Sequence, residues 1–157
     1  MKTISAFLGK IISHCLFVLM ALLVAVTFFQ VLCRFVFMFP AVWTEEVARM
    51  SFVWLIFLGA AIGVKEGTHL VLDMLASAVG PRLRRTMQIA ILALIIGLSG
   101  IILYAGGSYC WRSRGKTTVT MPVPANVIYA VIPLSATLMI FFGVEKLREK
   151  LAERGDA

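Results

Sequence analysis

Charged residues are unevenly spaced along this chain, and long stretches contain none. Residues 11–33 form a run of 23 uncharged residues, and residues 86–111 form a run of 26. About 20 helical residues are needed to cross a bilayer hydrocarbon core about 30 Å thick. Hydrophobic residues make up 61% of the sequence and charged residues 15%, whereas about 25% are charged in typical soluble domains. The sequence therefore predicts an integral membrane protein.

Four crossings account for most of the 157 residues, which we expect to form a single all-α membrane domain, residues 1–157. The predicted crossings are residues 11–34, 45–66, 86–111 and 125–144. The second uncharged run is short, but Thr44 as an N-cap and two glutamates in the first turn would lengthen the helix. Pro133 lies within the fourth crossing and predicts a kink, because proline removes a backbone hydrogen bond.

Residues 68–79 are too few to cross the membrane and too apolar to lie free in water. We expect a short interfacial helix there, between the second and third crossings. It carries His69 and Asp73, which are four residues apart and would share a helix face. Their pairing is most simply structural.

Lys and Arg residues flank the predicted crossings asymmetrically, and such residues favour the cytoplasmic side. One side would carry Lys2, Lys10, Lys65, Arg82, Arg84, Arg85, Lys146, Arg148, Lys150 and Arg154. The other side would carry only Arg34, Arg112, Arg114 and Lys116, with Arg49 near that border. Both termini are therefore predicted to be cytoplasmic. Because the basic residues are spread along membrane borders, the net charge of +7 indicates contact with lipids and not with nucleic acid.

The motifs of the common enzyme classes are missing from the sequence. It contains no Gly-rich phosphate loop, no nucleophile elbow and no His-Glu-x-x-His pattern, and its three cysteines lack metal-ligand spacing. We therefore expect no enzymatic activity, no metal site and no cofactor in this chain. Cys33 and Cys110 both fall toward the outer face, where they could pair, although free thiols are the favoured interpretation.

An ion-coupled transporter usually places an ionisable group deep within a membrane helix. The predicted crossings lack such a group, which argues that the chain acts with a partner. Small residues at four-residue spacing, Gly59, Gly63 and Gly67 with Ala60 beside them, would let another helix approach closely. Ala93 and Gly97 repeat the pattern. These faces could equally pack within the chain's own bundle.

The start of the second crossing carries a dense group of charges beside Trp43. Glu45 and Glu46 lie four and three residues before Arg49, so either carboxylate could reach the guanidinium on one helix face. With Arg34, the outer corner would be locally neutral. One interpretation is an ion-pair cluster within the chain, anchored by Trp43 at the interface. The other is a docking site for a partner protein.

An ordered set of residues, which begins at this corner and extends to the fourth crossing, resembles that of a known family. The set is Trp43-x-Glu45-Glu46-x-x-Arg49, Phe52-x-Trp54-x-x-Phe57-x-Gly59-Ala60, Gly67-x-His69 with Asp73, and Pro124, Tyr129 and Pro133. It resembles the small membrane subunit, the DctQ or Q subunit, of tripartite ATP-independent periplasmic (TRAP) transporters. The resemblance covers nearly the whole chain.

The resemblance implies sodium-driven uptake of an organic acid, usually a carboxylate, across a bacterial or archaeal cytoplasmic membrane. A periplasmic binding protein would deliver the substrate to a large elevator-type subunit that holds the sodium sites. This chain would form a heterodimer with the large subunit and act as its scaffold. Two other classes remain open from the residues: a tetraspan assembly or regulatory protein, and a small proton-coupled exporter, which would need a buried carboxylate.

Overall fold

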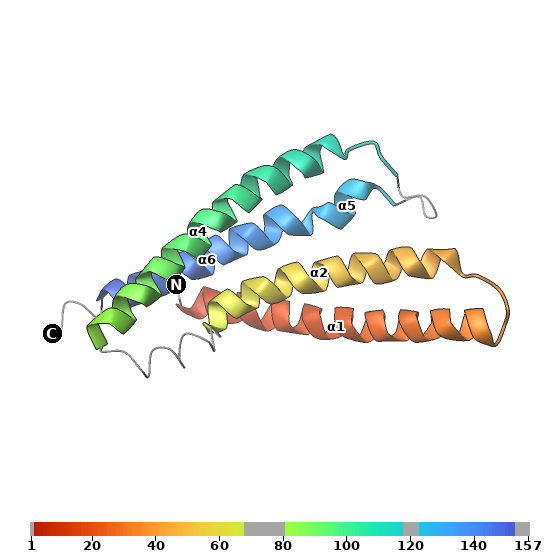
Figure 1. Ribbon diagram of the computed structural model, residues 1–157, viewed down its shortest axis with the longest axis horizontal. Coiled ribbons are helices and arrows are strands. Elements are labelled where there is room, and N and C mark those ends of the chain that lie inside the picture. Colours follow the sequence, from red (N-terminus) through yellow and green to blue (C-terminus); the bar gives the residue numbers. More distant parts are fainter. Residues whose placement is uncertain (1, 68–80, 118–122, 153–157) are drawn as a thin grey trace.

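Helices make up nearly all of the computed structural model, which describes residues 2–67, 81–117 and 123–152 (Figure 1). The helices are α1 (Lys2–Phe35), α2 (Val42–Glu66), α4 (Pro81–Arg112), α5 (Ala125–Tyr129) and α6 (Val131–Ala152). Within these ranges no strand forms, and an isolated antiparallel bridge joins Thr117 to Pro124. The predicted all-α class is confirmed. The expected interfacial helix, residues 68–79, lies outside the described residues.

Four helical segments are long and apolar enough to cross a membrane. They are Ser5–Phe35, Val42–Glu66, Thr86–Arg112 and Ala125–Leu151, the last of which combines α5 with most of α6. Each contains nearly all of one predicted crossing and extends beyond it at one or both ends. The charges that delimit the uncharged runs therefore mark the crossings well, while the helices themselves continue past those charges.

The prediction that Thr44 caps the second crossing is wrong. The N-cap of α2 is Ala41, and Thr44 is fully buried inside the first turn. Its hydroxyl donates a hydrogen bond to the Ala41 carbonyl, with 2.6 Å between the oxygens. A threonine hydroxyl can bond a preceding carbonyl as readily as it accepts from a helix amide, so the residue type alone does not fix the helix start. Glu45 does lie in the first turn.

Two helical hairpins, α1–α2 and α4–α6, are joined by contact between α2 and α6, which leaves α1 and α4 at the edges (Figure 1). The two hairpins lie close together where α1 begins and α6 ends, and we call this the terminal end. They diverge toward the α1–α2 loop, and we call that the loop end. Ile12, Leu58, Val64, Val131 and Phe142 form the buried apolar cluster. Placement of both termini at one end agrees with four crossings, and their cytoplasmic location remains a prediction.

Glycines allow α4 and α6 to approach each other closely. A Cβ atom built on Gly106 would lie 2.5 Å from Cγ2 of Ile132, and one on Gly143 would lie 2.9 Å from Cγ1 of Ile96. Lipid tails are as apolar as leucine side chains, so close packing at small residues contributes much of helix association in membranes. These two glycines therefore hold the second hairpin together.

The fourth crossing is divided into α5 and α6 at Ala130, close to Pro133, where the sequence predicts a kink. Because proline has no N–H, it cannot donate to the carbonyl of Tyr129, four residues before it. The helix is interrupted at Ala130, between α5 and α6, and the regular pattern resumes when the Leu134 N–H donates to the Ala130 carbonyl at 3.3 Å. The break lies beside the contact between Gly106 and Ile132, where the Gly106 Cβ position would be 3.5 Å from Pro133 Cδ.

Replacing Gly106 by leucine should lower the thermal stability of the purified chain, because the new side chain would overlap Ile132. Overpacking of this kind typically costs about 1–3 kcal/mol. The matched control is Gly107→Leu, because a Cβ atom there meets nothing within 4 Å. Melting temperatures in one detergent check the prediction, and equal values for the two variants would contradict the close contact.

Candidate partner-binding face on the second helix

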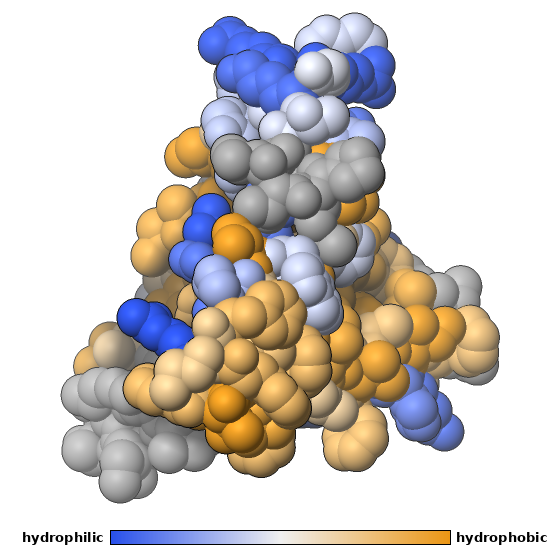
Figure 2. Space-filling model, turned by 90° about the vertical axis from the view of Figure 1, so that its right-hand side faces the viewer, coloured by the Kyte–Doolittle hydropathy of each residue, from blue (hydrophilic) through white to orange (hydrophobic). Residues whose placement is uncertain are grey.

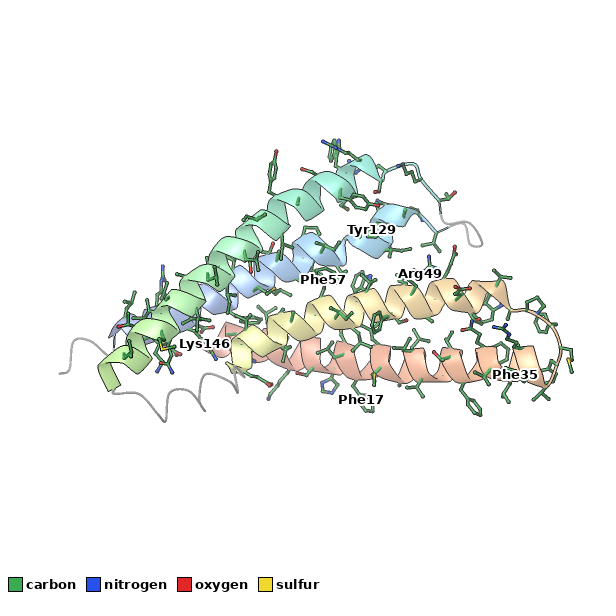
Figure 3. The ribbon with its side chains drawn as sticks, viewed as in Figure 1. Phe17, Phe35, Arg49, Phe57, Tyr129 and Lys146 are labelled. Carbon is green, nitrogen blue, oxygen red and sulfur yellow. The ribbon has the colours of Figure 1, made fainter. Side chains whose placement is uncertain are left out.

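The charged corner at the start of α2 contains an exposed ion pair. The Arg49 Nη2 atom lies 3.6 Å from Oε1 of Glu45, and the two side chains are 69% and 64% exposed. Figure 3 shows Arg49 on the side of α2 that faces α5, the helix that carries Tyr129. The sequence predicted that either glutamate could reach Arg49, and the structure shows the pair with Glu45. Glu46 is half-buried.

Arg34 joins this corner from the end of α1. Together with Gln30 and Glu45 it lines a cavity of about 330 Å³, whose remaining walls come from the α1–α2 loop and the start of α2. The predicted corner of two positive and two negative charges is thus partly assembled, with Arg34 and Glu45 around one cavity and Glu45 bound to Arg49.

The two tryptophans of α2 differ in their surroundings. Trp43 is 42% exposed, and its ring centroid lies 6.0 Å from that of Phe29, which ties α1 to α2 at the loop end. Trp54 is half-buried against the apolar cluster. Its indole nitrogen is buried and has no hydrogen-bond partner among the described residues. Trp43 therefore suits the interfacial position that the sequence predicts, whereas Trp54 contributes to packing.

Gly59 and Gly63 lie on an open face of α2. A Cβ atom on either glycine would meet nothing within 4 Å, and Ala60 beside them is exposed. The same holds for Gly97 on α4, near the exposed Ala93. Within the described ranges these small residues are therefore not used for close packing of the chain's own helices. Of the small-residue series that the sequence predicts, the part formed by Gly59, Ala60 and Gly63 is open with respect to the described residues.

Gly67 has a different role from the other two glycines of its series. It is the C-cap of α2, with a φ of 70°, and its N–H donates to the Gly63 carbonyl at 3.0 Å. A side chain at this position would meet the Nζ atom of Lys146 from α6. The left-handed backbone favours glycine, so Gly67 ends the helix and lies against α6.

The remaining sequence candidates contribute little to this face. His69 and Asp73 lie outside the described residues. Cys15, Cys33 and Cys110 are free, and the Cys110 thiol donates to the Asn126 carbonyl at 3.5 Å. In the ranges that the structure describes, no group of three or more His, Cys, Asp or Glu side chains could hold a metal ion.

Sequence reasoning missed three glycines that the bundle uses. Gly106 and Gly143 join α4 to α6, and a Cβ atom on Gly9 of α1 would meet the Nζ atom of Lys65. That same Nζ atom lies 5.9 Å from the centre of the Phe142 ring. The available signal was the glycine itself, since a glycine inside an apolar helix often has a packing reason. None of the three belongs to a series of glycines at four-residue spacing.

Comparison with known proteins identifies the family. Residues 23–153 match the model of the DctQ component of tripartite ATP-independent periplasmic transporters. The chain belongs to this family. It is therefore a transporter component and a multi-pass protein of the bacterial inner membrane. The family assignment favours a TRAP small permease subunit over the tetraspan regulator and the small exporter that the residues left open.

Several curated proteins are similar to the chain. It is 24% identical over 129 residues to the sialic acid TRAP transporter small permease protein SiaQ of Vibrio cholerae, covering 82% of this chain and 75% of that protein. It is 29% identical over 102 residues to the C4-dicarboxylate TRAP transporter small permease protein DctQ of Rhodobacter capsulatus, covering 64% and 45%. The chain is 26% identical over 118 residues to the sialic acid TRAP transporter permease protein SiaT of Haemophilus influenzae, covering 71% of this chain and 18% of SiaT.

Substitution of Gly67 by alanine should destabilise the chain by about 1–2 kcal/mol, because an L-residue is strained in the left-handed region. The Lys146 ammonium, at the end of a flexible side chain, can move aside, so the backbone strain is the main cost. Gly63→Ala is the control, since its Cβ has open space and alanine is the better helix former. Thermal unfolding of both variants checks the prediction. A Gly67→Ala variant as stable as Gly63→Ala would exclude a strained cap.

Proposed function

We propose that this chain is the scaffold of a TRAP transporter, bound to the static part of a large membrane subunit. The observation that carries the proposal is the uncovered face of Gly59 and Gly63, which lies on the same helix as the exposed Glu45–Arg49 pair. Small residues let a second helix approach α2 closely. An ion pair at the rim can fix the register of the two helices through complementary charge.

Relatives that combine a DctQ-like part with further sequence support a large partner. The matched region makes up 18% of SiaT, and 20% of the isethionate TRAP transporter permease protein DctMQ of Oleidesulfovibrio alaskensis. Both are named permease proteins, so in them the part similar to this chain belongs to a much longer polypeptide. We infer that this chain meets the equivalent of that longer part as a separate subunit, in a heterodimer.

The substrate would be an organic acid, and the driving force a sodium gradient. The relatives' names mention sialic acid, C4-dicarboxylates and isethionate, all of which are organic acids. No charged residue lies between Arg49 and Lys65 of α2, or between Lys10 and Arg34 of α1. Sodium and substrate sites would therefore lie in the large subunit, and a periplasmic binding protein would deliver the acid. Both termini would be cytoplasmic, as the basic residues predict.

Reconstitution tests the transport role. Proteoliposomes that contain this chain with the large subunit and the binding protein should accumulate a carboxylate under an inward sodium gradient. Vesicles with this chain alone should not, because it lacks a charged group at the membrane centre. Replacing sodium by potassium outside the vesicles is the control. Uptake by the chain alone would refute the scaffold role.

Gly63→Leu should reduce recovery of the large subunit with the tagged chain, because leucine would hold the two helices apart. The isolated chain should keep its melting temperature, since the Gly63 Cβ position is open. The control is Ala21→Leu, a small-to-large change at an exposed position on the far helix α1. Loss of the partner with Ala21→Leu and normal recovery with Gly63→Leu would place the docking face elsewhere.

A further inference from the structure

The loop between α1 and α2 is apolar throughout, although a connecting loop normally carries polar residues. Five consecutive large apolar residues are each more than half exposed: Phe35 (70%), Val36 (64%), Phe37 (63%), Met38 (83%) and Phe39 (53%). Val42 and Trp43, which follow Pro40 and Ala41, are 52% and 42% exposed. An exposed apolar patch of this kind marks contact with a membrane or with another protein.

Three of the five backbone donors in residues 36–41 are paired inside the chain. The N–H groups of Val36 and Phe37 donate to the Leu32 carbonyl at 2.8 and 3.1 Å, and that of Phe39 donates to the Cys33 carbonyl at 3.0 Å. Pro40 has no N–H to satisfy. The loop thus folds back onto the last turn of α1 and turns its side chains outward. This pairing leaves few backbone groups that need water, which the headgroup layer can still supply and the hydrocarbon core cannot.

The length of α1 places this loop at the membrane interface. From Lys10 to Arg34 the helix rises about 36 Å, at 1.5 Å per residue. The hydrocarbon core is about 30 Å thick, and the bilayer with its headgroup layers about 40–45 Å. With Lys10 at one border of the core, Arg34 lies just beyond the other. Residues 35–39 then fall within the headgroup layer, close in sequence to Trp43, a residue type that concentrates there.

A fluid lipid layer fits the loop better than a protein partner does. Successive residues of a tight turn project in different directions, so a partner on one side would leave several of the five side chains in water. Lipid surrounds all of them. The loop also continues the exposed apolar surface of α1, on which Phe28 is 64% and Val31 48% exposed.

The other loop at the same end has the opposite character. It begins with Arg112, Arg114 and Lys116, and the Arg114 guanidinium lies 3.8 Å from the centre of the Trp111 ring. Figure 2 shows hydrophilic residues gathered at the top of this end, around the end of α4, and hydrophobic residues over its lower part, where the α1–α2 loop lies. At the loop end, the part around the end of α4 therefore suits water, and the part around the α1–α2 loop suits lipid.

We propose that the α1–α2 loop, residues 35–43, is inserted into the phospholipid headgroup layer and anchors the first hairpin there. Arg34 then lies at the level of the lipid phosphates, to which a guanidinium donates strong hydrogen bonds. The inference concerns the lipid contact of this chain and holds whichever face binds the large subunit.

Spin-label accessibility in the assembled transporter tests the insertion. The complex with the large subunit is placed in phosphatidylcholine nanodiscs, with Cys15, Cys33 and Cys110 replaced by alanine. A nitroxide is attached at Phe37→Cys, or at Val36→Cys if the first variant folds poorly. Collision rates with oxygen, which concentrates in lipid, are compared with those of a water-soluble nickel chelate. Met20→Cys, at a position that is 53% exposed and midway along the first crossing, serves as the lipid-core reference. Lys116→Cys is the aqueous reference at the loop end.

The oxygen-to-nickel ratio at position 37 should be several-fold above that at position 116 and below that at position 20. A ratio equal to that of position 116 would mean that the loop lies in water and would overturn the proposal. Low collision rates with both reagents would mean that protein covers the loop, and this result would overturn it as well.

Discussion

Close approach of helices at small side chains is the constraint on which this bundle depends. In lipid, moving a leucine from the helix surface into a helix contact gains little, because the surroundings are equally apolar. Contacts must instead come from dispersion between surfaces that fit closely. Gly106 and Gly143 provide that fit between α4 and α6. The buried side chains of Ser99 and Ser135 on the same two helices have the same effect, since both are small.

Small and medium side chains also form the buried stripe of α2. Thr44, Ser51 and Leu58 are buried at intervals of seven residues, and Ala61 follows three residues later. This spacing is typical of helices that pack side by side with a small crossing angle. Gly59 and Gly63 fall outside the stripe, on a part of α2 that its neighbours in the chain leave open. One helix therefore presents a packed side and an uncovered side.

The number of crossings was readable from the sequence because an unpaired charge is costly in hydrocarbon. Charges therefore mark the ends of the crossings, and Pro133 marked the break between α5 and α6. The buried side of each helix was not readable. In a soluble helix the apolar stripe identifies it, but here both the packed and the lipid-facing sides are apolar. Gly106 and Gly107 are neighbours of identical type, and only the coordinates separate the packed residue from the open one.

The ion pairs of the charged corner at the start of α2 could be predicted only in part from the sequence, because they too depend on which side of the helix is buried. The spacing of Glu45, Glu46 and Arg49 allowed either carboxylate to reach the guanidinium, and the rotation of α2 about its axis brings Glu45 to within 3.6 Å of it. That rotation is set by Thr44, which is fully buried and lies next to Glu45. Burial of Thr44 turns Glu45 and Arg49 outward, where both remain largely exposed.

An exposed ion pair contributes about 0–1 kcal/mol in water. Covered by a partner helix, the same pair would lie in a lower dielectric, where its attraction is stronger and its geometry more selective. The packing that holds α2 inside the bundle thus also orients the charges that a partner would meet.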